Sequence, residues 1–330
     1  TCLRLSCLQS LKLQRRRRGT FRISAMPMLM LGGLGVCAGY ACALWMKEQE
    51  PPKGKDPNIK HASLGVIRLD WSYSPLPGDV GSSDSFEYPV YYRAVEGLTF
   101  EVCQKGEMTD EIKARFKEAI RYLDQDKQVS VIISDCGFFM WFQKLARDYT
   151  NKPVVMSSLA LLPAIHAAVG KTGKRTGKIA IFTANRDSLK TIHETVAEEM
   201  PIDWTKKCYL LVDCRDVPGF EAVATGEPVD FDKVSPGIVK KAVELTKNHR
   251  IDAFLFECTQ LPPFSDDVRA ATGLPVYDAV VCADFFVRGF VDNPRFGLND
   301  WQQSWDGKQE AYQLGDVEDK EKLVHYNQTH

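Results

Sequence analysis

Two of the ten cysteines follow short apolar runs of the kind that form buried strands. Cys136 comes three residues after the end of such a run at residues 129–133, and Cys258 comes two residues after the end of another at 253–256. In α/β proteins, ligands bind beyond the carboxyl ends of the parallel strands, so both thiols are expected at a binding edge. A deprotonated thiol is a base and a nucleophile. Two thiols that face one cleft can therefore act on opposite sides of a small substrate.

The ten cysteines allow three interpretations. A disulfide framework is typical of small secreted domains, whereas this chain has 330 residues. A structural zinc site is not favoured, because the sequence contains no C-x-x-C and Cys208 and Cys214 have no histidines at finger spacing. Reduced thiols, mostly buried and with one or two catalytic, are the favoured interpretation. We therefore predict no metal and no cofactor.

The segments around the two thiols alternate between strand and helix patterns. Short apolar runs predict strands over residues 64–69, 129–133, 178–182, 209–212, 253–256 and 275–277. Helices are predicted over residues 109–124, 139–150, 188–200 and 236–249. This alternation predicts parallel sheets, and the length allows two lobes. We expect an α/β protein with two pseudo-symmetric, doubly wound lobes (Rossmann-like or flavodoxin-like) and the active site in the cleft between them.

The first sixty residues do not share this pattern. Residues 23–46 carry no charge and are long enough to cross a hydrocarbon core of about 30 Å. Arginines at 15–18 precede them, as at the cytosolic end of a membrane anchor. Small residues in the same stretch also suit a cleaved targeting peptide, and a weakly structured leader is the third alternative. We predict a targeting or anchor leader and linker over residues 1–60.

The cysteine motifs resemble those of the aspartate/glutamate racemase superfamily, whose two pseudo-symmetric lobes each carry one thiol. Thr259 matches the second Cys-Thr pair of that superfamily, and residues 273–279 resemble its later Gly-x-Pro-Val-x-Asp segment. Both cysteine motifs depart from the racemase pattern. Gly137 follows the first cysteine where racemases usually have Asn, and Gln260 stands where they have His. An amino-acid racemase is therefore not favoured.

A closer resemblance is to the algal dimethylsulfoniopropionate lyases of the same superfamily. It runs through residues 65–70, 97–101, 135–140, 217–223, 257–259 and 292–297. The resemblance implies a carbon–sulfur lyase that removes a proton next to the substrate carboxylate and releases dimethyl sulfide and acrylate. Such an elimination needs only one base, because the second carbon loses a neutral leaving group. Partial loss of the first cysteine motif is easier to tolerate in a lyase than in a racemase.

The predicted catalytic residues are Cys258, as the principal base, and Cys136, which assists from the other face. Cys103 is a third, lower-ranked thiol. We expect helix N-termini to lower the pKa of the catalytic thiols. Asp135 and Glu257 are predicted to be structural, because alternation along a strand points them away from the neighbouring thiols.

The substrate has two charged ends, and each predicts its own partners. Hydroxyl and amide side chains are predicted to bind the carboxylate: Thr259, Thr183 and Asn185. Aromatic faces attract a soft cation that has no hydrogen-bond donors. The aromatic side chains predicted to bind the sulfonium are Phe138, Phe139 and Trp71, with a place in the helix core as the alternative for Phe139.

The predicted lobes are residues 61–165 plus 280–330, and residues 166–279. A net charge of −1 does not favour nucleic acid as a partner. We expect a small-molecule substrate, dimethylsulfoniopropionate, a homo-oligomer, and a location in the chloroplast or another membrane-bounded compartment, with residues 23–46 as the candidate membrane anchor. Two alternatives stay open: another superfamily isomerase, decarboxylase or racemase that acts on a small carboxylate, and a non-catalytic, membrane-tethered protein that binds small carboxylates.

Overall fold

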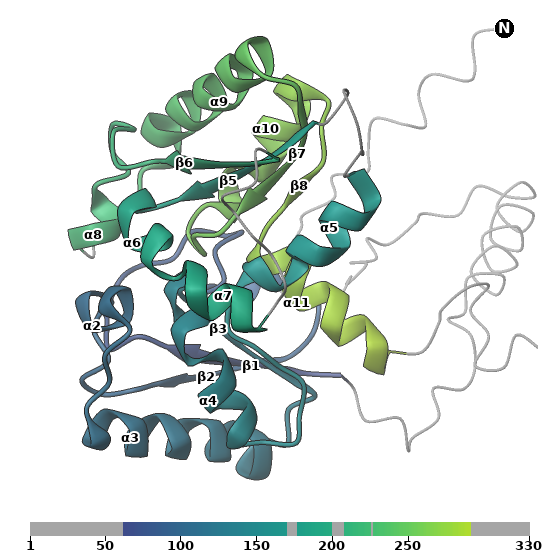
Figure 1. Ribbon diagram of the computed structural model, residues 1–330. Coiled ribbons are helices and arrows are strands. Elements are labelled where there is room, and N and C mark those ends of the chain that lie inside the picture. The colour runs from purple at the N-terminus through teal and green to yellow at the C-terminus, as the bar shows by residue number, and fades with distance from the viewer. Residues whose placement is uncertain (1–61, 170–176, 200–207, 226, 292–330) are drawn as a thin grey trace, which may run out of the picture. The chain divides into compact units, whose positions relative to one another are not determined.

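The computed structural model describes residues 62–169, 177–199, 208–225 and 227–291 (Figure 1). The chain divides into two units, Thr1–Lys55 and Asp56–His330, and every described residue belongs to the second unit. The predicted leader, residues 1–60, lies outside the described residues, as does the candidate anchor at 23–46. Among the residues that are described, no helix is both long and apolar enough to cross a membrane.

Two parallel four-stranded sheets repeat the same strand order. The first sheet runs β2 (Val90–Ala94), β1 (Leu64–Arg68), β3 (Val131–Ser134), β4 (Val154–Val155). The second runs β6 (Tyr209–Asp213), β5 (Lys178–Thr183), β7 (Ile251–Phe256), β8 (Val276–Tyr277). All strand pairs are parallel. The repeated order confirms the predicted α/β fold with two pseudo-symmetric lobes.

Helices cover the sheets and connect the strands (Figure 1). The α-helices are α2 (Phe100–Lys105), α3 (Asp110–Arg121), α4 (Gln143–Asp148), α5 (Leu162–Val169), α6 (Arg186–Thr191), α7 (His193–Glu199), α8 (Ala222–Thr225), α9 (Phe231–Asn248), α10 (Ser265–Thr272) and α11 (Ala279–Val287). Shorter helical turns are η1 (Ser83–Ser85), η2 (Tyr122–Asp126), η3 (Gly137–Phe142), η4 (Ser158–Leu161), η5 (Pro262–Phe264) and η6 (Arg288–Phe290).

The central strands are buried because helices pack on both of their faces. Every residue of β3 is buried, as expected of an apolar, β-branched strand in a parallel sheet. The edge strand β2 is mostly exposed or half-buried, and its sequence Val-Tyr-Tyr-Arg-Ala has no continuous apolar run. This pattern explains why β2 was not predicted.

Three predicted helices have different bounds in the structure. The segment 139–150 begins as the 3₁₀ turn η3 and becomes α-helical only at α4. The predicted helix 188–200 is two short helices, α6 and α7. Helix α9 begins five residues before Pro236, because the side chain of Asp230 accepts the amide of Lys233 and caps its first turn.

The last described helix returns to the first sheet. Helix α11 packs against β3, and its residues Cys282, Ala283 and Val287 belong to the same apolar core as β1 and β3. The exact lobe bounds at residues 165 and 280 stay a prediction.

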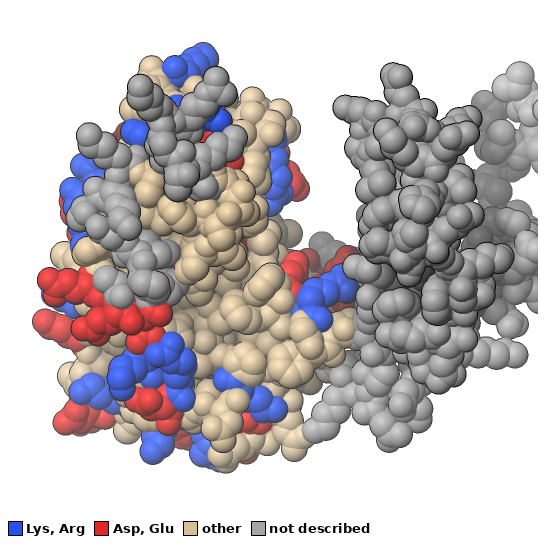
Figure 2. All heavy atoms as spheres, turned by 45° about the vertical axis from the view of Figure 1, so that its right-hand side comes forward, with Lys and Arg blue, Asp and Glu red and all other residues tan. Residues whose placement is uncertain are grey.

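One face of the molecule has a broad central area without charged side chains (Figure 2). Large apolar side chains remain exposed at the end of α11 and just after it. Phe285 is 62% exposed and Phe290 46%.

Candidate active site

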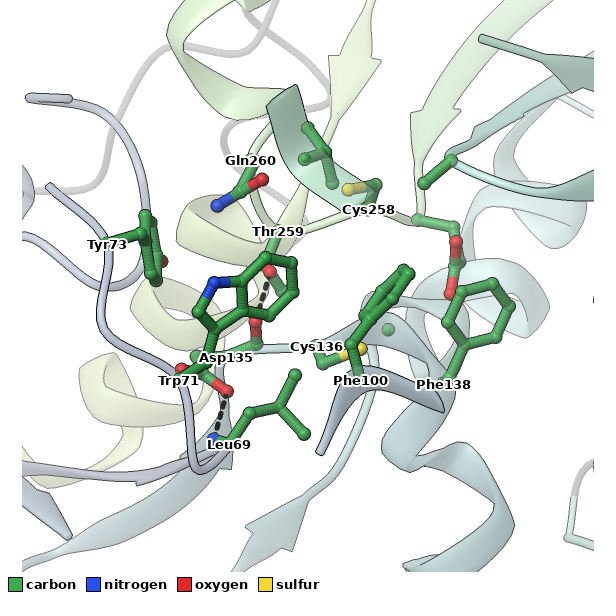
Figure 3. A pocket seen from close by; sticks show the side chains of 14 residues that line it. Leu69, Trp71, Tyr73, Phe100, Asp135, Cys136, Phe138, Cys258, Thr259 and Gln260 are labelled. Atoms are coloured by element: carbon green, nitrogen blue, oxygen red, sulfur yellow. Dashed lines mark hydrogen bonds between the residues drawn. The ribbon is translucent and has the colours of Figure 1, made fainter. Parts of the chain in front are cut away.

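A pocket lies beyond the carboxyl ends of β3 and β7 (Figure 3). The first lobe contributes Leu69, Trp71, Tyr73, Phe100, Asp135, Cys136, Gly137 and Phe138. The second contributes Ala184, Val223, Glu257, Cys258, Thr259 and Gln260. The pocket therefore contains both strand-end cysteines, one from each lobe, as the sequence predicts.

The two lobes are tied together directly beneath the pocket. The hydroxyl of Thr259 donates a hydrogen bond to the carbonyl oxygen of Asp135, so the two strand ends are joined. The hydroxyl of Ser158 donates to the carbonyl of Phe256 at 2.9 Å. These buried bonds hold the carboxyl ends of β3 and β7 together, and with them the thiols of Cys136 and Cys258.

A loop of the first lobe, residues 70–86, reaches across to the second lobe. Gly78 adopts φ +98°, and a Cβ atom there would be 3.0 Å from the Cα of Pro263. The hydroxyl of Tyr73 donates to Asp79 at 2.9 Å. This contact and hydrogen bond position Trp71 and Tyr73 in the wall of the pocket (Figure 3).

The environment of both thiols opposes ionisation. Burial raises the pKa of Cys136 and of Cys258 well above the ordinary value for a thiol. The backbone amide of Gln260 acts in the opposite direction on Cys258, and its effect is smaller than that of burial. The expectation that helix N-termini lower these pKa values is therefore wrong for the pocket without substrate.

Cys103 lies behind Cys136. Its sulfur is 3.9 Å from that of Cys136, and the side chain is fully buried in helix α2. Burial raises the pKa of Cys103, and the thiol does not line the pocket. The structure thus places the lower-ranked thiol in the apolar core behind Cys136 and outside the pocket wall.

Asp135 lines the pocket as half of an ion pair. Its carboxylate lies 3.2 Å from the Arg68 guanidinium and accepts the amide of Leu69 at 3.0 Å. Burial raises the pKa of Asp135 to about 6, although Arg68 acts to lower it. The negative charge of Asp135 is thus compensated within the protein.

Glu257 lines the same pocket with no compensating cation. The side chain is buried, and burial raises its pKa to about 7, while the hydroxyl of Thr183 acts to lower it. In the part of the chain that the structure describes, the Thr183 hydroxyl is the one donor that acts on this carboxyl, and it does not reach full hydrogen-bonding geometry to either oxygen. Asp135 and Glu257 were predicted to be structural, on the strand face opposite to the neighbouring thiols. Both line the pocket, because it lies beyond the sheet edge and each residue directly follows the last residue of its strand.

A row of aromatic rings forms one wall. The ring centroids of Trp71 and Phe100 are 5.2 Å apart, and those of Phe100 and Phe138 are 6.1 Å apart. Trp71 also contacts Tyr73 at 6.0 Å. Such a wall offers π faces to a soft cation. The predicted residues Trp71 and Phe138 both belong to it.

Phe139 lies elsewhere. Its ring is fully buried in the core of the first lobe, 6.1 Å from the rings of both Phe116 and Phe142. It does not line the pocket. This position corresponds to the helix-core alternative.

The three side chains predicted to bind the carboxylate all have other partners. The hydroxyl of Thr259 donates to Asp135, and Thr183 is fully buried beside Glu257. The amide oxygen of Asn185 accepts the backbone N–H groups of residues 187 and 188 and so caps helix α6. Of the three, only Thr259 lines the pocket.

Sequence reasoning missed or undervalued four lining residues. Tyr73 was not among the aromatic residues assigned to the sulfonium, and Phe100 and Gln260 carried no predicted role. Glu257 was predicted to be structural. Its position directly before Cys258 was the one indication in the sequence of a functional role. A glutamate at a buried strand end costs free energy unless its charge is paired.

No group of three His, Cys, Asp or Glu side chains that could hold a metal ion occurs within the described ranges. The predictions of no metal and no cofactor stay predictions.

Comparison with known proteins identifies the family. No family model matches the chain. It is 68% identical over 303 residues to a dimethylsulfoniopropionate lyase of Durusdinium sp. clade D. The alignment covers 91% of this chain and 99% of that relative. It is 51% identical over 274 residues to dimethylsulfoniopropionate lyase 7 of Emiliania huxleyi (strain CCMP1516), with coverage of 81% and 79%.

Among solved structures, arylmalonate decarboxylase is similar with a TM-score of 0.44 and 15% identity, over 69% of this chain and 92% of that one. A glutamate racemase of Bacillus anthracis is similar with a TM-score of 0.43 and 15% identity, over 70% and 81%. The sequence relatives share a much higher identity, and the first of them is matched over nearly its full length. This chain belongs to the family of the dimethylsulfoniopropionate lyases.

Proposed function

We propose that this protein is a dimethylsulfoniopropionate lyase that works by thiolate-catalysed β-elimination. The observation that carries the proposal is the presence of Cys136 and Cys258, from different lobes, in the wall of one aromatic pocket. The relatives named as dimethylsulfoniopropionate lyases support the same substrate.

In the proposed reaction, the Cys258 thiolate takes a proton from the carbon next to the substrate carboxylate. The electron pair of that C–H bond becomes the double bond of acrylate. The bond between the β-carbon and sulfur breaks, and dimethyl sulfide leaves with its electron pair. Cys258 is then a neutral thiol and must release the proton before the next turnover.

Substrate binding helps to form the base. The free pocket disfavours a thiolate because burial raises the pKa of Cys258. A sulfonium cation bound beside the sulfur favours the charged thiolate and shifts the pKa back down. The base therefore forms mainly in the complex, where it is needed.

The substrate carboxylate requires donors that are still available. Gln260 and Trp71 carry side-chain N–H groups and lie on the same side of the pocket (Figure 3). The Gln260 amide oxygen is buried and has no hydrogen-bond partner in the described part of the chain. No hydrogen bond to that oxygen therefore fixes the orientation of the amide group. We assign the carboxylate to these two residues in place of Thr183 and Asn185.

The test is direct. The full chain is incubated with dimethylsulfoniopropionate, dimethyl sulfide is measured in the headspace, and acrylate is measured in solution. We expect both products in equal amounts. Absence of dimethyl sulfide from folded protein would refute the proposal and favour another reaction on a small carboxylate, or a binding role.

A further inference from the structure

Glu257 is a buried carboxylate that the elimination mechanism leaves unused. Its exposed fraction is 1%, and it lines the pocket. Within the described ranges, only the Thr183 hydroxyl acts on its carboxyl group, without full hydrogen-bonding geometry, and no cationic side chain lowers its pKa. An unpaired buried charge is costly. A buried carboxylate that destabilises the folded protein in this way is a candidate for ligand binding.

The contrast with Asp135 shows which carboxyl group leaves an uncompensated negative charge in the pocket when it is ionised. Both carboxylates line the pocket, but Asp135 has Arg68 at 3.2 Å and the Leu69 amide at 3.0 Å. Glu257 has only the neighbouring hydroxyl of Thr183. When both carboxylates are ionised, the negative charge of Glu257 is the one left for a ligand.

The turn after Cys136 leaves room for this carboxylate. A Cβ atom on Gly137 would be 2.0 Å from Oε1 of Glu257 and 2.4 Å from its carboxyl carbon. The carboxyl group thus lies against the bare backbone of Gly137, next to Phe138 and the aromatic wall. Its charge opposes ionisation of both pocket thiols, so activation of the base does not explain it.

We propose that Glu257 is the counter-charge for the sulfonium group and selects substrates that end in a methylated onium cation. This inference rests on the proposed function and extends it to specificity. A dimethylsulfonium group has no N–H or O–H, so its partner needs charge and not hydrogen-bond geometry. A carboxylate without a paired cation, in the same pocket as Phe138, Phe100 and Trp71, meets that need.

The experiment compares two ligands of nearly equal shape and different charge. They are 3-(trimethylammonio)propanoate, which ends in a cation, and 4,4-dimethylpentanoate, in which carbon replaces the nitrogen. Binding to the full chain is measured by calorimetry. We expect the wild-type protein to prefer the cationic ligand by ~10-fold or more, which is the scale of a desolvated charge pair.

Four variants locate the source of the preference. Glu257→Gln should bind both ligands about equally, and Glu257→Asp should keep part of the preference. Cys258→Ser should keep most of it while losing the elimination, because it leaves the carboxylate in place and removes only the attraction between the thiolate and the cation. Gly137→Ala places a methyl group where the carboxyl lies and should reduce the preference, so it tests the same site independently if Glu257→Gln fails to fold.

The outcomes separate this inference from the proposed function. An undiminished preference in Glu257→Gln, or no preference in the wild type, overturns the inference, while dimethyl sulfide release by the wild type keeps the proposed function. A preference that depends on Glu257 in a protein that releases no dimethyl sulfide would overturn the proposed function and support the cation site.

Discussion

The base in the proposed reaction lies in surroundings that favour its neutral form. Cys258 is 8% exposed, and burial raises its pKa. The neighbouring carboxylate of Glu257 acts in the same direction. An onium cation reverses both effects at once, since it pairs with the carboxylate and stabilises a thiolate. At the residue scale, binding and activation of the base are therefore coupled.

The thiols differ in their expected importance. Cys258→Ser keeps the shape of the side chain but removes the acidity, and general base catalysis is worth ~10²–10⁴-fold in rate. We expect a loss of that size in kcat/KM for dimethyl sulfide release, and a smaller loss for Cys136→Ser. Cys208→Ser, outside the pocket, is the control and should retain activity. Near-normal activity of Cys258→Ser would exclude Cys258 as the base.

The raised pKa of Glu257 predicts how stability changes with pH. The pKa rises from 4.5 in the unfolded chain to about 7 in the folded protein, so folding favours the neutral acid. This contribution is fully present below about pH 4.5 and is lost as pH rises through about 7. Glu257→Gln cannot ionise, so its stability relative to wild type should increase by about 3 kcal/mol over this window.

Urea unfolding at pH 5 and pH 8 measures this difference. Other buried carboxyls, such as Asp79 and Asp135, titrate in both proteins and cancel in the comparison. Glu118→Gln, an exposed position on α3, is the matched control and should show no pH-dependent difference. Parallel pH profiles for wild type and Glu257→Gln would mean that Glu257 does not carry the shifted pKa.

At the scale of elements, the loop of residues 70–86 links the lobes over the site. It carries Trp71 and Tyr73 and contacts the second lobe at Pro263, where Gly78 packs with φ +98°. The amide of Val80 also points to the carbonyl of Thr259 at 3.5 Å. A loop held in this way positions one wall of the pocket relative to a thiol of the other lobe.

Substitution of Gly78 tests the loop. Gly78→Ala adds the cost of a left-handed backbone, about 1–2 kcal/mol, and a close contact with the Pro263 backbone. We expect KM for dimethylsulfoniopropionate to rise several-fold as the loop is displaced. Gly273→Ala is matched to it, since Gly273 has φ +67° with nothing within 4 Å and caps α10 away from the pocket. Gly273→Ala should lose a similar free energy of unfolding and keep the wild-type KM. Equal KM values for the two variants would rule out a role for the loop in substrate binding.

At the scale of the whole molecule, an uncharged face agrees with the predicted homo-oligomer. Phe285 and Phe290 are exposed near the end of α11, and the face in Figure 2 lacks charges over its centre. Apolar side chains of this kind are typical of contacts between subunits. Oligomer formation stays a prediction until it is measured.

Light scattering coupled to size-exclusion chromatography gives the test. We expect the wild type to elute as an oligomer and Phe285→Glu to shift toward the monomer, because the charge must be desolvated at the interface. Tyr91→Glu, which adds the same charge at an exposed aromatic position on β2, should not change the mass. A monomeric wild type would contradict the prediction.

The sequence alone was sufficient for the features that depend on local pattern. Apolar runs and helical spacing predicted six of the strands and the α/β class, because burial on both faces leaves a continuous apolar signature. The same runs showed that Cys136 and Cys258 end strands. Strand ends of parallel sheets meet at one edge, so a shared pocket followed from position alone.

The pairing of polar groups required the folded structure. Asp135 and Glu257 occupy equivalent places before the two cysteines, yet Asp135 is neutralised by Arg68, while no cation among the described residues acts on Glu257. The hydroxyl of Thr259 was predicted to bind substrate, but it is held by the carbonyl of Asp135. These partners lie 67 and 124 residues apart in the chain. Contacts over such separations depend on how strands and lobes pack, and no local periodicity records them.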